Sequence, residues 1–350
     1  SPPRIGRSAF ARDLDLANVD LANGGLRRHP AGYTPRAMRI ARPLAILLFL
    51  LGCGGDATPT DEPTSGAEAP PERYDVPSGD VQAALAGAHR TDEERARDRW
   101  RHPAETLAFF EVEPGKDVVE LWPGRGWYTK ILAPLLRDQG SLTVGLTDPE
   151  AEGYRGTLAQ AFFEMQQAHP ELYGHVRTAV LSPPDHTELG APESADVVLT
   201  FRNTHNWTQD GVQEAVYAAA FRVLRPGGIL GVVQHRDAEG AEADAERGYL
   251  PQAFVIETAE AAGFELVEAS EINANPADTH DHPNGVWSLP PALRGGEEGR
   301  EGFLAIGESD RMTLKFRKPL ADAEGESGDA DESAEDGGGA DESADADAAS

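Results

Sequence analysis

The chain has 350 residues, a formal net charge of −29 at pH 7 and a single cysteine. Such an acidic chain repels phosphate backbones, so we expect no nucleic-acid partner, and one cysteine excludes an internal disulfide framework. Residues 76–318 alone carry a net charge of −17 and are numerous enough for one domain with a sizeable core.

The first 53 residues divide into two segments. Residues 1–37 show no hydrophobic period, and we expect them to be upstream sequence read through before a start at Met38. Residues 38–53 combine two arginines with a short apolar run, as a secretory signal does. The run ends at Leu50-Leu51-Gly52-Cys53, which resembles the bacterial lipobox. We therefore expect Cys53 to be lipidated; a chance cysteine after an apolar segment is the alternative.

These features predict attachment to the bacterial cell envelope through a lipid on Cys53, at the periplasmic or outer-membrane face. If the leader is not processed, the protein would be cytoplasmic. Residues 54–78 are rich in Pro, Thr, Gly, Ala and Glu, which predicts a flexible tether. Residues 319–350 carry 12 acidic residues and no basic ones, which predicts a disordered acidic tail. The folded domain is then expected over residues 79–318.

Within that domain, segments with helical and strand-like patterns alternate. The expected helices are, in chain order, 80–99, 102–112, 128–137, 151–168, 208–224 and 249–262. The expected strands are 117–121, 141–146, 176–181, 196–201, 229–234, 264–272 and 312–318. Strands that alternate with helices of this length are typical of a parallel sheet with helices on both faces.

The turn after the first expected strand is the most informative segment. The apolar strand 117–121 contains Glu120 and leads into Trp122-Pro123-Gly124-Arg125-Gly126 and a helical pattern. Glycine lets the backbone approach a ligand closely, and a carboxylate near the end of the strand can accept hydrogen bonds from it. The order of strand, turn and helix predicts a nucleoside-type cofactor site at the mouth of the sheet. An ordinary turn with a solvated Glu120 is the alternative.

Two further features make a family resemblance specific. Leu224-Arg225-Pro226-Gly227-Gly228-Ile229-Leu230 places a Pro-Gly-Gly turn before the fifth strand, and another strand follows late in the chain. With the glycine turn, these segments resemble the class I S-adenosylmethionine-dependent methyltransferases. The resemblance implies a three-layer α/β Rossmann-like fold whose mostly parallel seven-stranded sheet has one antiparallel strand. It also implies S-adenosylmethionine as cofactor.

A narrower resemblance covers about residues 85–318. It is to a group of bacterial proteins described as predicted methyltransferases. The segments that carry it are Arg101-His102-Pro103 and residues 120–129, 200–207, 270–276, 281–287 and 307–316.

The resemblance implies roles for the residues of the first turn. Gly124 and Gly126 would let the backbone meet the methionine end of the cofactor, and Glu120 would support that end. Trp122 stands where the superfamily has its first glycine, and an indole there narrows the room for the cofactor's amino-acid moiety.

Two more acids are implied as contacts of the adenosine end. Asp148 is the nearest candidate for the ribose, although Thr147 has the more usual spacing after the second strand. Asp185 follows the third strand, where the adenine amine is usually held; a plain turn residue is the alternative.

Candidate catalytic residues follow the fourth and fifth strands. Methyl transfer needs alignment of the reactants and exclusion of water, and an oxygen or nitrogen nucleophile can need a base. Asn203 and His205 follow the fourth strand, at the carboxyl edge of the sheet where open α/β folds bind ligands. His205 is the first candidate for base or orienting group and His235 the second. A structural hydrogen bond is the alternative.

A polar segment precedes the last strand, and its candidate substrate-facing residues are Asn273, Asn275, His280, Asp281, His282 and Arg311. The segment could be a substrate-facing lid, a self-bonded structural loop or a metal site. Two histidines separated by one residue are a weak metal pattern, so no metal is predicted. Arg311 would hold a substrate carboxylate or Glu308.

The sequence therefore predicts an S-adenosylmethionine-dependent methyltransferase with a small-molecule substrate. The alternative is an envelope lipoprotein that keeps the fold as a non-catalytic ligand-binding or scaffold module. Export would separate the protein from a cofactor made in the cytoplasm, and Trp122 slightly favours this alternative. A dinucleotide oxidoreductase would need a third glycine in the turn, and a metal-dependent hydrolase would have to be built on the His-Asp segment.

Overall fold

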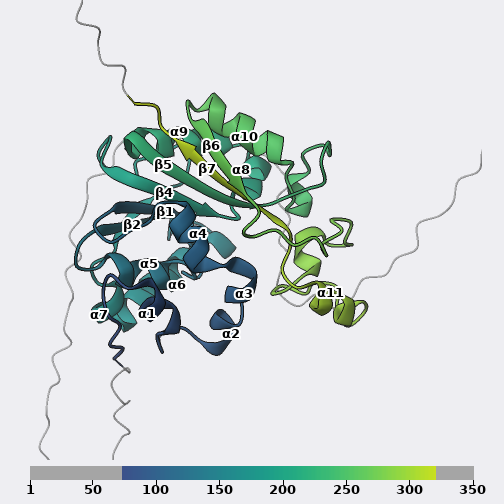
Figure 1. Ribbon diagram of the computed structural model, residues 1–350, viewed down its shortest axis with the longest axis horizontal. Coiled ribbons are helices and arrows are strands. Elements are labelled where there is room, and N and C mark those ends of the chain that lie inside the picture. The colour runs from purple at the N-terminus through teal and green to yellow at the C-terminus, as the bar shows by residue number, and fades with distance from the viewer. Residues whose placement is uncertain (1–72, 321–350) are drawn as a thin grey trace, which may run out of the picture. The chain divides into compact units, whose positions relative to one another are not determined.

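The computed structural model describes residues 73–320 (Figure 1). The predictions for residues 1–37 and 38–53, including the lipidated Cys53, lie outside the described residues, as do most of the tether and nearly all of the acidic tail. No helix in the described part of the chain is long and apolar enough to cross a bilayer.

The domain is built on one seven-stranded sheet with the order β3-β2-β1-β4-β5-β7-β6 (Figure 1). The strands are β1 (Asp117–Leu121), β2 (Ser141–Leu146), β3 (Arg177–Val180), β4 (Ala195–Phe201), β5 (Leu224–His235), β6 (Glu265–Ser270) and β7 (Arg311–Arg317). Strands β1 to β5 pair in parallel, whereas β7 pairs antiparallel with both β5 and β6. This arrangement confirms the predicted Rossmann-like methyltransferase fold with one antiparallel strand.

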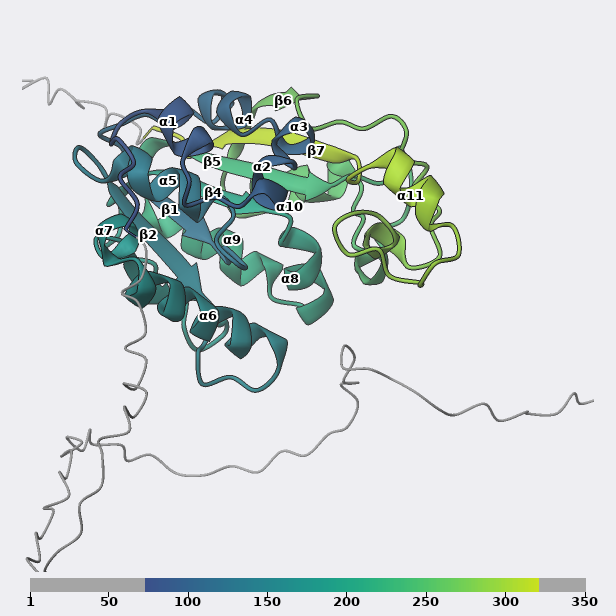
Figure 2. The same ribbon diagram turned by 90° about the horizontal axis from the view of Figure 1, so that it is seen from below.

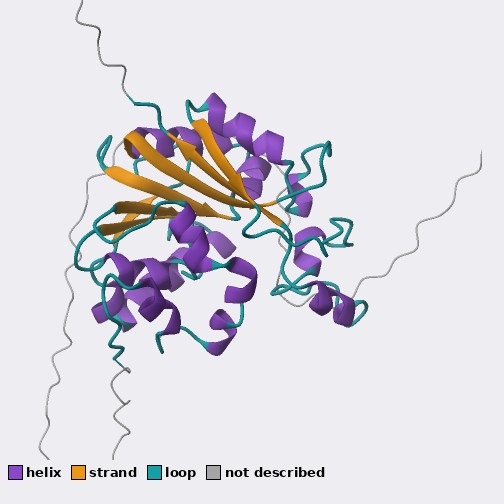
Figure 3. Ribbon diagram, in the orientation of Figure 1, coloured by secondary structure: helices purple, strands orange, loops and turns teal. Residues whose placement is uncertain are grey.

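Helices cover both faces of the sheet (Figure 3), and Figure 2 shows the same elements turned by 90°. They are α1 (Val81–Ala86), α2 (Asp92–Arg95), α3 (Asp98–Arg101), α4 (Pro103–Phe109), α5 (Thr129–Leu136), α6 (Tyr154–Ala168), α7 (Pro170–Tyr173), α8 (Thr204–Asp210), α9 (Gln213–Val223), α10 (Gln252–Ala261) and α11 (Arg300–Ile306). Successive residues of a strand face opposite sides, so Val118 joins the apolar cluster with α1, α4, α5, α6 and α7, and Val119 the cluster with α8, α9 and α10.

The expected helix over 80–99 is three short helices instead. Polar residues inside the stretch start new helices, because their side chains satisfy free backbone N–H groups. Asp80 accepts from the N–H groups of Gln82 and Ala83 at the start of α1, and Thr91 and Glu94 form a capping box at α2.

The expected helix over 208–224 is also divided, into α8 and α9. Gly211 ends α8 with φ +69°, a left-handed conformation that glycine adopts without strain. Strand β5 begins at Leu224, so the Pro-Gly-Gly segment that was expected to turn lies within the strand. The pattern did not predict α7 or α11.

A single glycine lets α4 approach the centre of the sheet. Phe110 at the end of α4 is fully buried. Its ring lies over Gly231 of β5 so closely that a Cβ on Gly231 would be 2.6 Å from it. The ring therefore occupies the space that a side chain of β5 would otherwise fill.

We expect Phe110→Ala to lower the free energy of unfolding by about 3–5 kcal/mol, because the cavity it leaves faces a glycine that cannot fill it. Urea denaturation followed by circular dichroism measures this change. Leu304→Ala is the control, since the Leu304 side chain is 51% exposed and its loss should cost less than about 0.5 kcal/mol. Equal losses for the two variants would contradict the assigned packing.

Candidate functional site

The backbone of the first turn is open to a ligand at Gly124. The turn begins where the N–H of Trp122 donates to the carbonyl of Gly145 on β2, at 2.8 Å. Gly124 has φ +61°, and a Cβ added there would meet nothing within 4 Å. Such a left-handed residue beside empty space leaves the main chain accessible, which suits close approach by a small molecule.

Glu120 belongs to β1, two residues before Trp122, and is buried, with 1% of its surface exposed. Its carboxyl accepts a hydrogen bond from the hydroxyl of Thr129, at 2.6 Å, at the start of α5. Burial raises the pKa of Glu120 to about 7, although the Thr129 hydroxyl acts in the opposite direction. A cation bound nearby would favour its ionised form.

Trp122 has φ +44°, an unusual conformation for a bulky residue. Its indole Nε1 donates to the carbonyl of Leu181, which follows β3, at 2.9 Å. The ring also lies edge-on to Trp207, with centroids 5.7 Å apart, and the guanidinium of Arg155 lies 4.8 Å from its centroid. The indole thus points toward β2 and β3. By the family resemblance, the ribose and adenine of the cofactor would lie beside β2 and β3. The sequence had instead suggested that the indole narrows the room for the cofactor's amino-acid moiety.

A cavity of about 100 Å³ adjoins the turn. It is lined by Trp122, Pro123, Gly124, Leu146, Thr147, Tyr154, Arg155, Leu158, Ala159, Asn203 and Asn206. This volume is below the roughly 300–1,000 Å³ of ordinary small-molecule sites. Arg155 also forms an ion pair with Asp210 of α8.

The two acids expected at the adenosine end do not line this cavity. Asp148 is partly exposed and accepts from the backbone N–H of Glu150 at 2.8 Å, as a turn residue does. Asp185 is exposed in the turn between Ser182 and His186. Thr147 is the residue after β2 that lines the cavity, and its hydroxyl donates to the carbonyl of Arg155 at 2.7 Å.

These observations fit one end of S-adenosylmethionine. The open backbone at Gly124 and the buried carboxyl of Glu120 suit its amino-acid end. Beside Thr147, the indole of Trp122 and the guanidinium of Arg155 line the cavity and leave less room than an ordinary small-molecule site provides.

Asn203 fastens β4 to the first turn. Its side-chain amide donates to the carbonyls of Leu121 at 3.0 Å and Trp122 at 3.1 Å. The preceding residue, Arg202, has φ +62°, and its N–H donates to the carbonyl of Val233. Asn203 therefore positions the turn, and it also lines the cavity.

His205 and His235 lie together, with ring centroids 5.4 Å apart. His205 Nδ1 is within 3.3 Å of the Gln234 side chain, and His235 Nδ1 is 2.5 Å from the hydroxyl of Ser309. Burial lowers the pKa of His205 to about 4 and that of His235 well below its usual value. Both imidazoles are therefore neutral at neutral pH. In this form they are better suited to orient a ligand through hydrogen bonds than to carry a proton.

The polar segment before β7 is bonded mainly to itself, around the buried Asp278. Asp278 accepts from the Tyr249 hydroxyl at 3.0 and 2.9 Å, and from the backbone N–H of Asp310 at 2.8 Å. His282 Nε2 lies 2.8 Å from the same carboxylate. Asp281 is exposed, and His280 Nε2 is 3.5 Å from Asp310.

The two asparagines of this segment also make structural contacts. Asn273 donates to the hydroxyls of Thr106 at 3.0 Å and Thr313 at 2.9 Å. Asn275 donates to the carbonyls of Ile306 and Glu308. This geometry favours the self-bonded loop among the three alternatives. Within residues 73–320 there is no group of three histidine, cysteine or acidic side chains suited to a metal ion.

A cluster of arginines that the sequence did not predict lies beside His235. Arg311 pairs with Glu308, the second of its two expected partners, and Glu308 also pairs with Arg97 and Arg101. The charges of Arg101 and Arg311 also lower the pKa of Arg202, and the charge of Arg202 lowers the pKa of Glu308. Arg101 and Arg202 stand in segments that carry the family resemblance, and this was the available signal.

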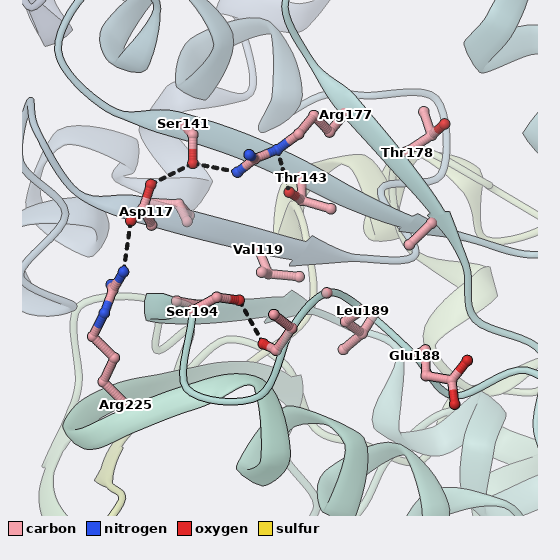
Figure 4. Close-up of a pocket in the computed structure, with 15 residues that line it drawn as sticks. Asp117, Val119, Ser141, Thr143, Arg177, Thr178, Glu188, Leu189, Ser194 and Arg225 are labelled. Atoms are coloured by element: carbon pink, nitrogen blue, oxygen red, sulfur yellow. Dashed lines mark hydrogen bonds and ion pairs between the residues drawn. The ribbon is translucent and has the colours of Figure 1, made fainter.

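A larger cavity, of about 720 Å³, lies at the opposite, amino edge of the sheet (Figure 4). Its polar residues form a chain of contacts: Arg225 pairs with Asp117 at 2.9 Å, and Ser141 donates to Asp117 at 2.5 Å and accepts from Arg177 at 2.6 Å (Figure 4). Ligands of open α/β sheets bind at the carboxyl edge, so the candidate site is the first turn.

Comparison with known proteins shows that the chain is similar in fold to several solved structures. No known protein family and no curated protein matches the chain. Among solved structures, the 4+2 cyclase SpnF is 16% identical, with a TM-score of 0.45 over 72% of this chain and 89% of that one. A SAM-dependent methyltransferase from Aquifex aeolicus is 16% identical, with a TM-score of 0.40 over 51% and 87%.

A third similar structure is the 1,6-didemethyltoxoflavin-N1-methyltransferase of Burkholderia thailandensis, solved with 1,6-didemethyltoxoflavin and S-adenosylhomocysteine. It is 14% identical, with a TM-score of 0.41 over 65% of this chain and 83% of that one. At these identities the likeness concerns the fold alone, and a fold does not by itself define an activity.

We expect Glu120→Gln to stabilise the protein increasingly as the pH rises. The pKa of Glu120 is about 7 in the folded protein, against an ordinary value of 4.5. Between these values the unfolded chain has released the proton while the folded one still binds it, so wild-type stability falls as the pH rises. Glutamine does not ionise, and its advantage should grow by about 3 kcal/mol between about pH 4.5 and 7.

Urea denaturation across this pH range measures the difference. Glu265→Gln, at an exposed position of β6, is the control and should show no such trend. A constant difference between Glu120→Gln and wild type would contradict the raised pKa.

Proposed function

We propose that the protein is an S-adenosylmethionine-dependent methyltransferase that acts on a small molecule. The observation that carries the proposal is the first turn, where open space surrounds the Cβ position of Gly124 and the preceding strand carries the buried carboxyl of Glu120. Both are at the carboxyl edge of a sheet with the methyltransferase strand order. In an open α/β fold of this kind, a cofactor is expected at the carboxyl edge of the sheet.

The cofactor, when bound, supplies an electrophilic methyl group, so the protein's main tasks are orientation and exclusion of water. Gly124, Gly126 and Glu120 would hold its amino-acid end, and Asn203 keeps the turn fixed against β4. The neutral imidazoles of His205 and His235 can orient an acceptor through hydrogen bonds. Thr147, rather than Asp148 or Asp185, is the candidate contact for the ribose.

Binding of the whole cofactor at this site requires side chains beside Thr147 to move. The cavity of about 100 Å³ is too small for a nucleoside. Arg155 belongs to α6, and its side chain is 40% exposed. Withdrawal of Arg155 from the indole face would enlarge the cavity without disturbing β1.

The second candidate is a non-catalytic ligand-binding module of the cell envelope, attached through a lipid on Cys53. Trp122 favours it, because the indole is held in the cofactor region by Leu181, Trp207 and Arg155. Loss of membrane association in Cys53→Ser, compared with wild type in cell fractionation, tests the attachment. Unchanged fractionation would contradict it.

Calorimetric titration of the full chain with S-adenosylmethionine and S-adenosylhomocysteine tests the first candidate. We expect binding by wild type and at least a tenfold loss in Gly124→Val, because the new side chain enters the open space beside the turn. Gly240→Val is the matched control, since Gly240 also has a positive φ and open space around it but lies outside the cavity.

The outcomes separate the two candidates. Equal loss in both glycine variants would mean that backbone strain, and not the pocket, determines binding. Binding that appears only after Trp122→Gly would favour the non-catalytic module. Absence of binding in wild type and in Trp122→Gly would exclude S-adenosylmethionine as the ligand.

A further inference from the structure

Positive charge exceeds negative charge in a buried cluster beside the two histidines. Arg97 Nε lies 2.6 Å from one oxygen of Glu308, and Arg101 Nε lies 3.0 Å from the other. Arg311 pairs with the same carboxylate and donates to the carbonyl of Trp100 at 3.0 Å. Three guanidinium groups thus share one carboxylate.

Arg202 adds a fourth positive charge. Arg202 is partly exposed, and within residues 73–320 its guanidinium pairs with no carboxylate, since Glu308 pairs with the other three arginines. It follows Phe201, whose ring stacks on that of Tyr128 with centroids 3.5 Å apart, and the Tyr128 hydroxyl donates to the carbonyl of Arg101. Arg202 therefore lies on the same part of the edge as Arg101. Partial burial, followed by the charges of Arg101 and Arg311, holds the pKa of Arg202 well below its usual value.

Nearby acids do not restore the balance. Asp98 pairs with Arg90 at 2.6 Å, and Asp310 pairs with Arg236 at 2.8 Å. Burial alone would raise the pKa of Glu308, but Arg101, Arg311 and Arg97 hold that pKa well below its usual value, so Glu308 is already ionised. Glu308 therefore cannot supply more negative charge to balance the arginines.

Three donor groups among the described residues of the cluster are both buried and unpartnered, namely Nη1 and Nη2 of Arg101 and Nε of Arg311. The side chain of Arg101 is 2% exposed, and within residues 73–320 neither its Nη1 nor its Nη2 has a hydrogen-bond partner. Burial lowers the pKa of Arg101 to about 10, which still leaves the group charged at neutral pH. A buried cation without enough partners is costly, and buried donors in a native protein almost always have a partner in protein, water or a bound ion. Arg101 therefore has two donors free for an anion.

The cluster adjoins the proposed reaction site. Arg202 directly precedes Asn203, which fastens the cofactor turn. Arg311 begins β7 opposite His235 of β5, and His235 in turn contacts Ser309. An anion held here would lie at the carboxyl edge, near His235.

We propose that Arg97, Arg101, Arg202 and Arg311 bind the carboxylate or phosphate of a small molecule. Guanidinium groups recognise both anions through paired hydrogen bonds. Burial of Arg101 and Arg311 favours a small ligand over a macromolecule. Identification of this ligand as the methyl acceptor rests on the proposed function, whereas the binding of the anion does not.

Arg202→Gln tests this site, with Arg202→Lys as the conservative variant. Removal of an unpaired charge that its neighbours repel should raise the melting temperature of the ligand-free protein. The same change should weaken anion binding about 10- to 100-fold, because one charge-assisted contact is lost. Arg202→Lys should lie between wild type and Arg202→Gln. Arg99→Gln, at an exposed position on α3, should change neither property.

Calorimetry and thermal denaturation of the full chain measure these effects, with inorganic phosphate and malonate as probes at constant ionic strength. Tighter binding of phosphate would assign a phosphorylated ligand, and tighter binding of malonate a carboxylate. Either result supports the site if Arg202→Gln reduces it. No binding of either probe at millimolar concentration, or equal binding by Arg202→Gln and wild type, would overturn the proposal.

The test is independent of the cofactor. Anion binding together with no binding of S-adenosylhomocysteine would leave the arginine site standing and remove the methyltransferase. Binding of S-adenosylhomocysteine without binding of either anion would keep the methyltransferase and remove the arginine site.

Discussion

Charge balance around Glu308 is the constraint that joins the separate parts of the carboxyl edge. The carboxylate draws Arg97 and Arg101 from the helices before the sheet and Arg311 from its antiparallel strand. Loss of one partner from such a buried network leaves other charges uncompensated, which typically costs about 3–5 kcal/mol. The same contacts that hold these segments together therefore concentrate positive charge at the carboxyl edge of the sheet.

The first turn is held in place by side-chain hydrogen bonds to and from the segments beside it. Asn203 bonds to two carbonyls of the turn, and Trp122 bonds to the carbonyl that follows β3. These side-chain bonds connect the carboxyl ends of three strands, β4, β1 and β3, independently of the sheet ladder. They keep Gly124 accessible while the indole limits the space next to it. The residues that organise the site are thus also those that restrict its ligand.

Sequence patterns predicted the sheet well, because apolar runs bounded by turn residues define buried strands; β1 and β2 have the expected bounds. The helix expected over 80–99 was wrong because capping residues interrupt a polar stretch without apolar spacing. The glycine turn was visible as a local motif. The arginine cluster was not, since Arg101 and Glu308 are 207 positions apart and only the folded chain brings them together.

Residues 271–310 connect β6 to β7 and contain only short helices at Gly285–Ser288 and Arg300–Ile306. A connection of this length would retain much conformational entropy if its ends alone were fixed. Asp278 divides it into smaller closed loops, because its carboxylate bonds to Tyr249, His282 and the backbone of Asp310. One acidic side chain thus acts as a crosslink, and the segment that carries Glu308 and Ser309 is held without a disulfide.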